Sequence, residues 1–85
     1  MIPSHLFHKS CETKCFSAEA SDLKGYWRGG PITIVSDLGH TATFECVETV
    51  YDDEGDIRCW DFEPTEESLD KIPQLKGWFI TIFND

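Results

Sequence analysis

Alternating apolar and polar positions dominate the chain after Pro31 and predict a sheet. The segment 32–35 is rich in β-branched residues, and positions 41–51 form a long alternating run. A second alternating run covers 57–63, and the apolar stretch over 77–83 is suited to a central strand. We therefore expect at least four strands in this part of the chain.

Turn-forming residues separate these predicted strands. The segment 36–39 predicts one turn, and 52–56 predicts a hairpin turn with Gly55 in the left-handed conformation. Pro64 should end the returning strand, because proline cannot donate to a ladder. Thr65 is suited to cap a short helical turn over 65–72.

The hairpin turn also predicts a register in which Asp52 faces Asp56 and every later pair follows by alternation. In that register Val50 faces Arg58, Glu48 faces Trp60, and Cys46 faces Phe62. Glu48 and Arg58 become diagonal neighbours that can pair. Cys59 opposes Thr49 and points away from Cys46, so we expect no disulfide between these cysteines. One apolar face results, made of Ala42, Phe44, Cys46, Val50, Trp60 and Phe62.

The first 30 residues have a different pattern. Positions 3–20 show weak helical spacing, with Ser4 as a candidate cap and apolar residues at 7, 11, 15 and 18. The glycine-rich stretch 24–31 is typical of a loop. We therefore expect one small acidic domain over 1–85, in which 1–30 form an N-terminal arm or helix with a loop and 31–85 form an antiparallel sheet.

The expected fold class is mainly β, a small antiparallel sheet of four to five strands that is twisted or barrel-like, with a short N-terminal helix or arm. An α+β fold is the alternative. A chain of 85 residues forms a single core of limited size. Its large hydrophobic residues indicate that it folds without a cofactor.

Negative charge is concentrated in one part of the sequence. The net charge is −9, and the segment 45–70 holds eleven carboxylates against Arg58 alone. Phosphate backbones and anionic membranes attract clustered lysine and arginine, so neither nucleic acid nor a membrane is the expected partner. A basic protein is the electrostatic complement.

The N-terminal residues do not resemble a secretory signal, and no apolar stretch has the length of a membrane span. These features favour a cytoplasmic protein. In that compartment the four cysteines are expected to be reduced.

Two histidines and two cysteines lie close together in sequence, at His5, His8, Cys11 and Cys15. Neutral imidazoles and thiolates are the donors that zinc prefers. Structural zinc sites usually join two separated chain segments, however, and this cluster covers only eleven residues. One alternative is that Cys11 and Cys15 are small buried hydrophobic residues and the histidines are surface residues. A local disulfide between Cys11 and Cys15 is the other alternative. If a metal binds, we expect His8, Cys11 and Cys15 as ligands, with a fourth from His5 or His40.

The glycine-rich loop carries Tyr26, Trp27 and Arg28, which are residue types that anchor protein interfaces. The alternative is that Trp27 folds back and covers one end of the core.

No hydrolase, phosphate-loop or zinc-protease motif is present, so we do not expect an enzyme. The sequence favours a non-catalytic acidic module that binds a basic protein, of the inhibitor, immunity, nucleic-acid-mimic or accessory type. A small zinc-binding domain and a structural subunit without activity are the alternatives. The predicted binding residues are Glu45, Asp52, Asp53, Glu54, Asp56, Asp61, Glu63, Tyr26, Trp27 and Arg28.

Overall fold

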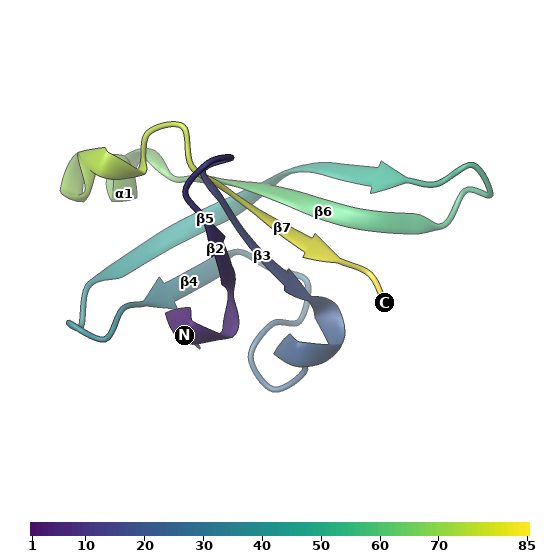
Figure 1. The fold of residues 1–85 in the computed structure, drawn as a ribbon, viewed down its shortest axis with the longest axis horizontal. Helices are drawn as coiled ribbons and strands as arrows, with labels where there is room; N and C mark the ends of the chain where they lie inside the picture. Colours follow the sequence, from purple (N-terminus) through teal and green to yellow (C-terminus); the bar gives the residue numbers. More distant parts are fainter.

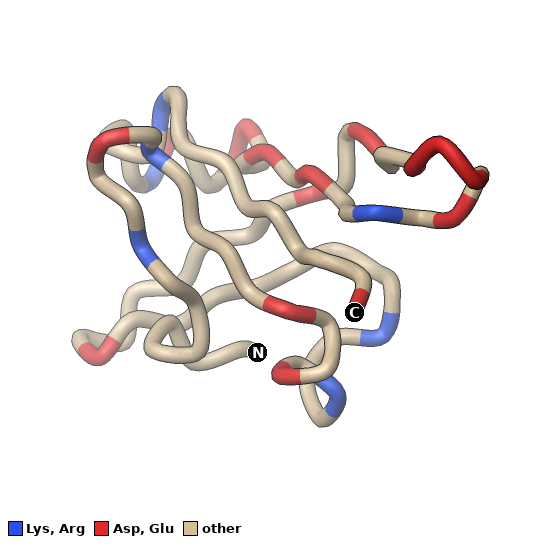
Figure 2. Tube along the Cα trace, turned by 45° about the vertical axis from the view of Figure 1, so that its right-hand side comes forward, with Lys and Arg blue, Asp and Glu red and all other residues tan.

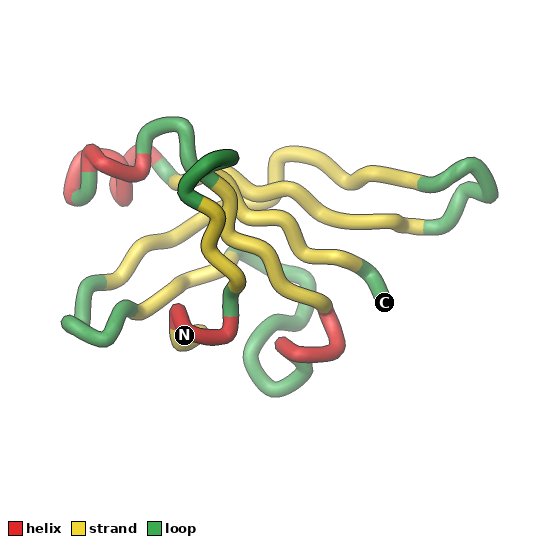
Figure 3. The backbone as a smooth tube through the Cα atoms, viewed as in Figure 1, coloured by secondary structure: helices red, strands yellow, loops and turns green.

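Seven strands form one sheet that curls into a half-barrel in the computed structural model, which describes residues 1–85 (Figures 1 and 3). The order across the sheet is β1-β4-β5-β6-β7-β3-β2. The strands are β1 (Ile2–Pro3), β2 (His8–Ser10), β3 (Cys15–Glu19), β4 (Ile32–Val35), β5 (Thr41–Tyr51), β6 (Ile57–Pro64) and β7 (Phe79–Phe83).

The helical segments are short. They are the 3-10 turns η1 (Ser4–Leu6), η2 (Ala20–Leu23) and η3 (Pro73–Leu75), and the α-helix α1 (Glu66–Lys71). Thr65 caps α1, because its hydroxyl accepts a hydrogen bond from the Ser68 backbone N–H at 3.2 Å. None of these helices has the length and apolar character needed to cross a bilayer.

The predicted elements after Pro31 are confirmed. Strands occupy 32–35, 41–51, 57–64 and 79–83, and the capped helix lies between the last two. Gly55 has φ of 86°, the left-handed conformation that the hairpin turn needs. The mainly β, barrel-like fold class is also confirmed.

The predicted N-terminal helix is wrong. Residues 8–19 form the two strands β2 and β3, which pair antiparallel with Ser10 opposite Cys15. The helical spacing of residues 7, 11, 15 and 18 misled the prediction, because Ala18 and Phe7 are buried from separate elements instead of one helix face. The sheet consequently has seven strands instead of four or five.

Two strand pairs are parallel, so the sheet is not purely antiparallel as expected. β3 pairs with β7 in parallel, with Phe16 opposite Ile80, and β1 pairs with β4 in parallel. β1 and β2 are the two edges of the sheet, and η1 joins them directly. The first ten residues therefore connect both edges of the half-barrel.

The concave face of the sheet, called the inner face below, carries the core. Alternate residues of each strand point there, such as Phe44, Phe62 and Ile80, and all three are at most 1 % exposed. The buried core consists of Ile2, Phe7, Ala18, Leu23, Ile32, Ile34, Phe44, Phe62, Ile80 and Ile82.

Trp27 packs against this core instead of forming a free surface. Its ring lies 5.0 Å from that of Trp60 and 6.0 Å from that of Phe62, and its Nε1 donates to the Gly30 carbonyl at 2.8 Å. A half-buried tryptophan that packs in this way covers the end of the core, the second of the two interpretations of the loop.

Candidate functional site

The β5–β6 hairpin extends well beyond the rest of the sheet. β4 pairs only with 41–44 of β5, and β7 pairs only with 59–62 of β6. The distal part of the hairpin, residues 46–58, forms a projection that we call the finger (Figure 1). It contributes to the elongated shape of the molecule, which measures 40 × 25 × 24 Å.

Two bulges correct the predicted register of this hairpin. Cys46 does face Phe62, but the next pair is Glu48 with Asp61, so Val47 is an extra residue in β5. Further out, Val50 faces Cys59 and Tyr51 faces Ile57, which leaves Arg58 as an extra residue in β6. The expected pairs of Glu48 with Trp60 and of Val50 with Arg58 are therefore wrong.

The bulge at Val47 moves Glu48 onto the convex face of the sheet, called the outer face below. Strict alternation after Cys46 would have placed Glu48 beside Trp60 on the inner face. With the extra residue, Glu48 shares the outer face with Asp61 and Val50. Cys46 and Cys59 still lie on opposite faces, and all four cysteines are free.

Four carboxylates consequently lie in two directly opposed pairs on the outer face. Glu45 faces Glu63, and Glu48 faces Asp61. The predicted pairing of Glu48 with Arg58 is not formed, since the one ion pair of the structure joins Lys71 Nζ to Glu67 Oε1 at 3.2 Å. Like charges opposite each other in a sheet are destabilising. We call Glu45, Glu48, Asp61 and Glu63 the outer carboxylates.

Asp61 is held in place by a hydrogen bond across the sheet. The Thr81 hydroxyl donates to Asp61 Oδ1 at 2.8 Å, and the Cys15 thiol lies 3.9 Å from the same hydroxyl oxygen. Burial raises the pKa of the Cys15 thiol despite these hydrogen bonds. Burial also raises the pKa of Cys59, and the nearby charge of Asp61 adds to that effect. A raised thiol pKa lowers the fraction of the reactive thiolate form at a given pH.

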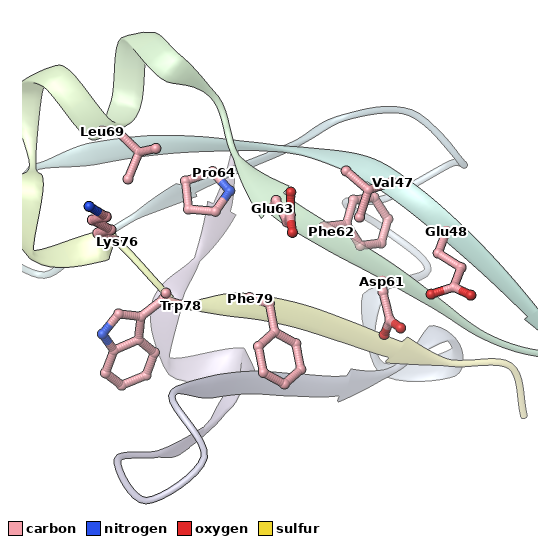
Figure 4. A pocket seen from close by; sticks show the side chains of 11 residues that line it. Val47, Glu48, Asp61, Phe62, Glu63, Pro64, Leu69, Lys76, Trp78 and Phe79 are labelled. Carbon is pink, nitrogen blue, oxygen red and sulfur yellow. The ribbon is translucent and has the colours of Figure 1, made fainter.

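A groove of about 400 Å³ runs beside the outer carboxylates, between the hairpin and the segment that joins α1 to β7 (Figure 4). Glu48, Asp61 and Glu63 supply its negative charge, and Lys76 is its one cation. We call this hollow the acidic groove. Its remaining lining residues are Val47, Phe62, Pro64, Leu69, Gly77, Trp78 and Phe79.

The tip of the finger carries the other predicted carboxylates (Figure 2). Asp52 has a structural role, because its Oδ1 accepts hydrogen bonds from the backbone N–H groups of Glu54 and Asp56, both at 2.9 Å. Asp53, Glu54 and Asp56 are exposed. Their side chains are free to meet a partner without changing the turn.

No protein-family model, curated protein or solved structure matches this chain. The chemistry of the site therefore rests on its own geometry. Carboxylates beside exposed apolar side chains can receive lysine or arginine, because those side chains combine an apolar stem with a charged head.

The N-terminal histidines and cysteines are spread over different elements. His5 lies in η1, His8 in β2, Cys11 in the following turn and Cys15 in β3. His40 precedes β5. The structure contains no group of three or more histidine, cysteine or acidic side chains that could hold a metal ion.

Tyr26 and Arg28 are exposed, yet they lie apart from the outer carboxylates. Their neighbour Trp27 packs against Trp60 and Phe62, which point to the inner face. Asp61 and Glu63 alternate with those residues and point the other way. The structure therefore divides the predicted binding residues between two sides of the sheet.

Of the residues that line the groove, only Asp61 and Glu63 were among the predicted binding residues. Glu48 was missed, and so was the rest of the lining, including Val47, Leu69, Lys76 and Phe79. One feature of the sequence could have indicated the extra residue at Val47. Glu45 and Glu48 are three positions apart, so a regular strand would direct one of them to the core face, and an extra residue resolves that conflict. Leu69, Lys76 and Phe79 reach the groove through tertiary packing, which has no local signal.

Proposed function

We propose that this protein is a non-catalytic binding module whose hairpin carboxylates bind a basic protein. The observation that carries the proposal is the two like-charged cross-strand pairs on the outer face, Glu45 opposite Glu63 and Glu48 opposite Asp61. None of these carboxylates forms an ion pair within the chain. A partner's lysine or arginine placed between such carboxylates would relieve their repulsion and form charge-assisted hydrogen bonds.

The acidic groove supports the same proposal. Val47, Leu69 and Phe79 offer apolar surface next to Glu48 and Asp61. A lysine or arginine of the partner could pack its methylene groups on these apolar side chains and direct its charged group to the two carboxylates. Shape and charge together would then favour basic partners over other proteins.

The projecting finger adds a kinetic argument. Asp53, Glu54 and Asp56 lie at its far end, where they meet an approaching molecule first. Clustered charge of one sign raises the association rate with a partner of opposite sign. We propose that the tip steers the partner and that the outer carboxylates hold it.

Affinity capture from lysate at two salt concentrations tests this proposal. The wild-type protein should retain a basic protein at about 20 mM salt and lose it at about 500 mM, because salt screens charges over a shorter distance as its concentration rises. The variant E48Q/D61N/E63Q should retain about tenfold less of it.

The matched control is E12Q/D22N/D37N, which removes three exposed carboxylates far from the hairpin in sequence. It changes the net charge by the same amount, so it should retain the partner as the wild type does. Equal losses in both triple variants, or retention that does not depend on salt, would show that the hairpin is not the binding site.

A further inference from the structure

A second hollow is lined in part by residues of the β4–β5 turn and of η3. The β4–β5 turn lies at the left of Figure 1. The volume of the hollow is about 350 Å³, and it is separate from the acidic groove. We call it the barrel mouth. It is lined by Ser4, Lys9, Phe16, Ile34, Ser36, His40, Ala42, Phe44, Ile72 and Leu75.

The interior of the barrel mouth is apolar. Ile34 and Phe44 are buried, whereas Phe16, Ile72 and Leu75 are only half-buried and leave apolar surface open to water. Binding pockets for small organic molecules have volumes of roughly 300 to 1,000 Å³ and linings of this kind. Filling the mouth would remove that surface from water, which is favourable.

The one charged residue of the barrel mouth, Lys9, is opposite in sign to the net charge of the protein. The chain has 16 acidic residues against seven lysines and arginines, yet no carboxylate lines the mouth. Lys9 and His40 do. A smaller hollow next to it is lined by His40, Thr41, Lys71 and Ile72, although Lys71 is already paired with Glu67. Asp37 follows Ser36 in the turn but does not line either hollow.

The two basic side chains of the mouth have no acidic partner. The ammonium of Lys9 lies 5.5 Å from the ring centroid of Trp78, and neither Lys9 nor His40 forms an ion pair with a carboxylate. Lys9 lies opposite Phe16 across the β2–β3 pair, so its charge sits beside the apolar lining. An unpaired ammonium beside an apolar hollow is complementary to an amphipathic anion.

We propose that the barrel mouth binds a small aliphatic carboxylate, with the hydrocarbon chain among Phe16, Ile72 and Leu75 and the carboxylate near Lys9 and His40. A chain of about eight to ten carbon atoms matches a pocket at the lower end of the usual size range. This proposal does not rest on the proposed protein-binding function. The two hollows share no lining residue, although the Lys9 ammonium lies over Trp78, which lines the acidic groove.

A titration with decanoate, followed by ¹H–¹⁵N NMR, tests this assignment. Saturable shifts should appear at Phe16, Ala42, Phe44, Ile72 and Leu75. Decyltrimethylammonium has a chain of the same length with the opposite charge, and it should bind at least about fivefold more weakly, as expected when one charge contact is lost.

Two variants separate the apolar part of the site from the charged part. Lys9→Gln should weaken the binding of decanoate about fivefold and leave the binding of neutral decanol unchanged. Lys24→Gln, at an exposed residue, is the control and should change the binding of neither ligand. Ala42→Phe should block both ligands by filling the mouth.

Three results of the ligand titrations would overturn the proposal. They are shifts that do not saturate, shifts centred on the acidic groove at Val47 and Leu69, and equal affinity for the anionic and cationic ligands. Shifts of the mouth residues that depend on protein concentration without any ligand would also contradict it, because they would show that a second copy of the chain covers the mouth.

Discussion

The two halves of β5 differ in almost every physical property although they belong to one strand. Residues 41–44 pair with β4 on one side and continue into the pairing with β6 on the other, and Phe44 is 1 % exposed. Residues 46–51 pair with β6 alone, and Val47 and Tyr51 are 53 % and 60 % exposed. Residues 41–44 stabilise the fold. Residues 46–51 include Glu48 opposite Asp61, a like-charged pair that destabilises the sheet.

The bulge at Val47 lies where the two halves meet. It lies just past the last residue that pairs with β4, and it directs Glu48 to the outer face. Placing the irregularity outside the core allows acidic side chains to gather without disturbing the buried residues. Stability and the proposed binding should therefore respond to different substitutions.

The largest expected effect on stability comes from a substitution in residues 41–44 of β5. Phe44→Ala should lower the free energy of unfolding by about 3 to 5 kcal/mol, because it leaves a cavity in the core. Val47→Ala, in residues 46–51, should change the free energy of unfolding by no more than about 0.5 kcal/mol. Urea denaturation of both variants measures the contrast, and similar losses would show that the finger is part of the stabilising core.

Alkylation of the thiols compares the finger with the sheet behind it. Cys46 is exposed, whereas Cys59 is 8 % exposed and burial raises its pKa. Iodoacetamide near neutral pH should modify Cys46 at least about tenfold faster than Cys59, since the thiolate is the reactive form. Mass spectrometry of timed samples gives both rates, and equal rates would contradict the burial of Cys59.

Deleting Val47 tests the interpretation of the bulge. Without this extra residue, Cys46 would still face Phe62 and Glu48 would still face Asp61 in a regular ladder. The free energy of unfolding should change by no more than about 1 kcal/mol. Cross-strand NOEs between Glu48 and Asp61 should persist. An NOE pattern that pairs Glu48 with Trp60 would show that Val47 is not the inserted residue.

The smallest effect concerns the repulsion between opposed carboxylates. Glu63→Gln should raise the free energy of unfolding by about 0.2 to 1 kcal/mol at low salt, because Glu45 then faces a neutral side chain. The gain should vanish near 1 M salt, where charges are screened within about 3 Å. Asp37→Asn, in an exposed turn, is the control and should show no gain at either salt concentration.

The part of the fold after Pro31 could be predicted because its signals are local. β-Branched residues predicted β4, and alternation predicted β5 and β6. Gly55 predicted the hairpin turn, and Thr65 predicted the helix cap. β2 and β3 could not be predicted in the same way. β3 pairs with β7, more than 60 residues away, so its conformation depends on a partner that no neighbouring residue indicates.

The site was predicted in composition but not in geometry. Glu45, Asp61 and Glu63 were predicted from the sequence as binding residues, which stays a prediction, and the register places all three on one face. Glu48 was assigned to the wrong face, because a single bulge reverses every side chain that follows it. Trp27 was proposed as a surface residue or a core residue, and only the packing distances to Trp60 and Phe62 distinguished the two.

The most direct test of the central claim is an NMR titration of the protein with a tetra-arginine peptide at about 20 mM and about 300 mM salt. The account predicts shifts concentrated at the outer carboxylates and the finger tip, residues 45–48, 53–56 and 61–63, which nearly disappear at the higher salt concentration. Shifts spread evenly over all exposed acidic residues, including Glu12, Asp22 and Asp37, would contradict it.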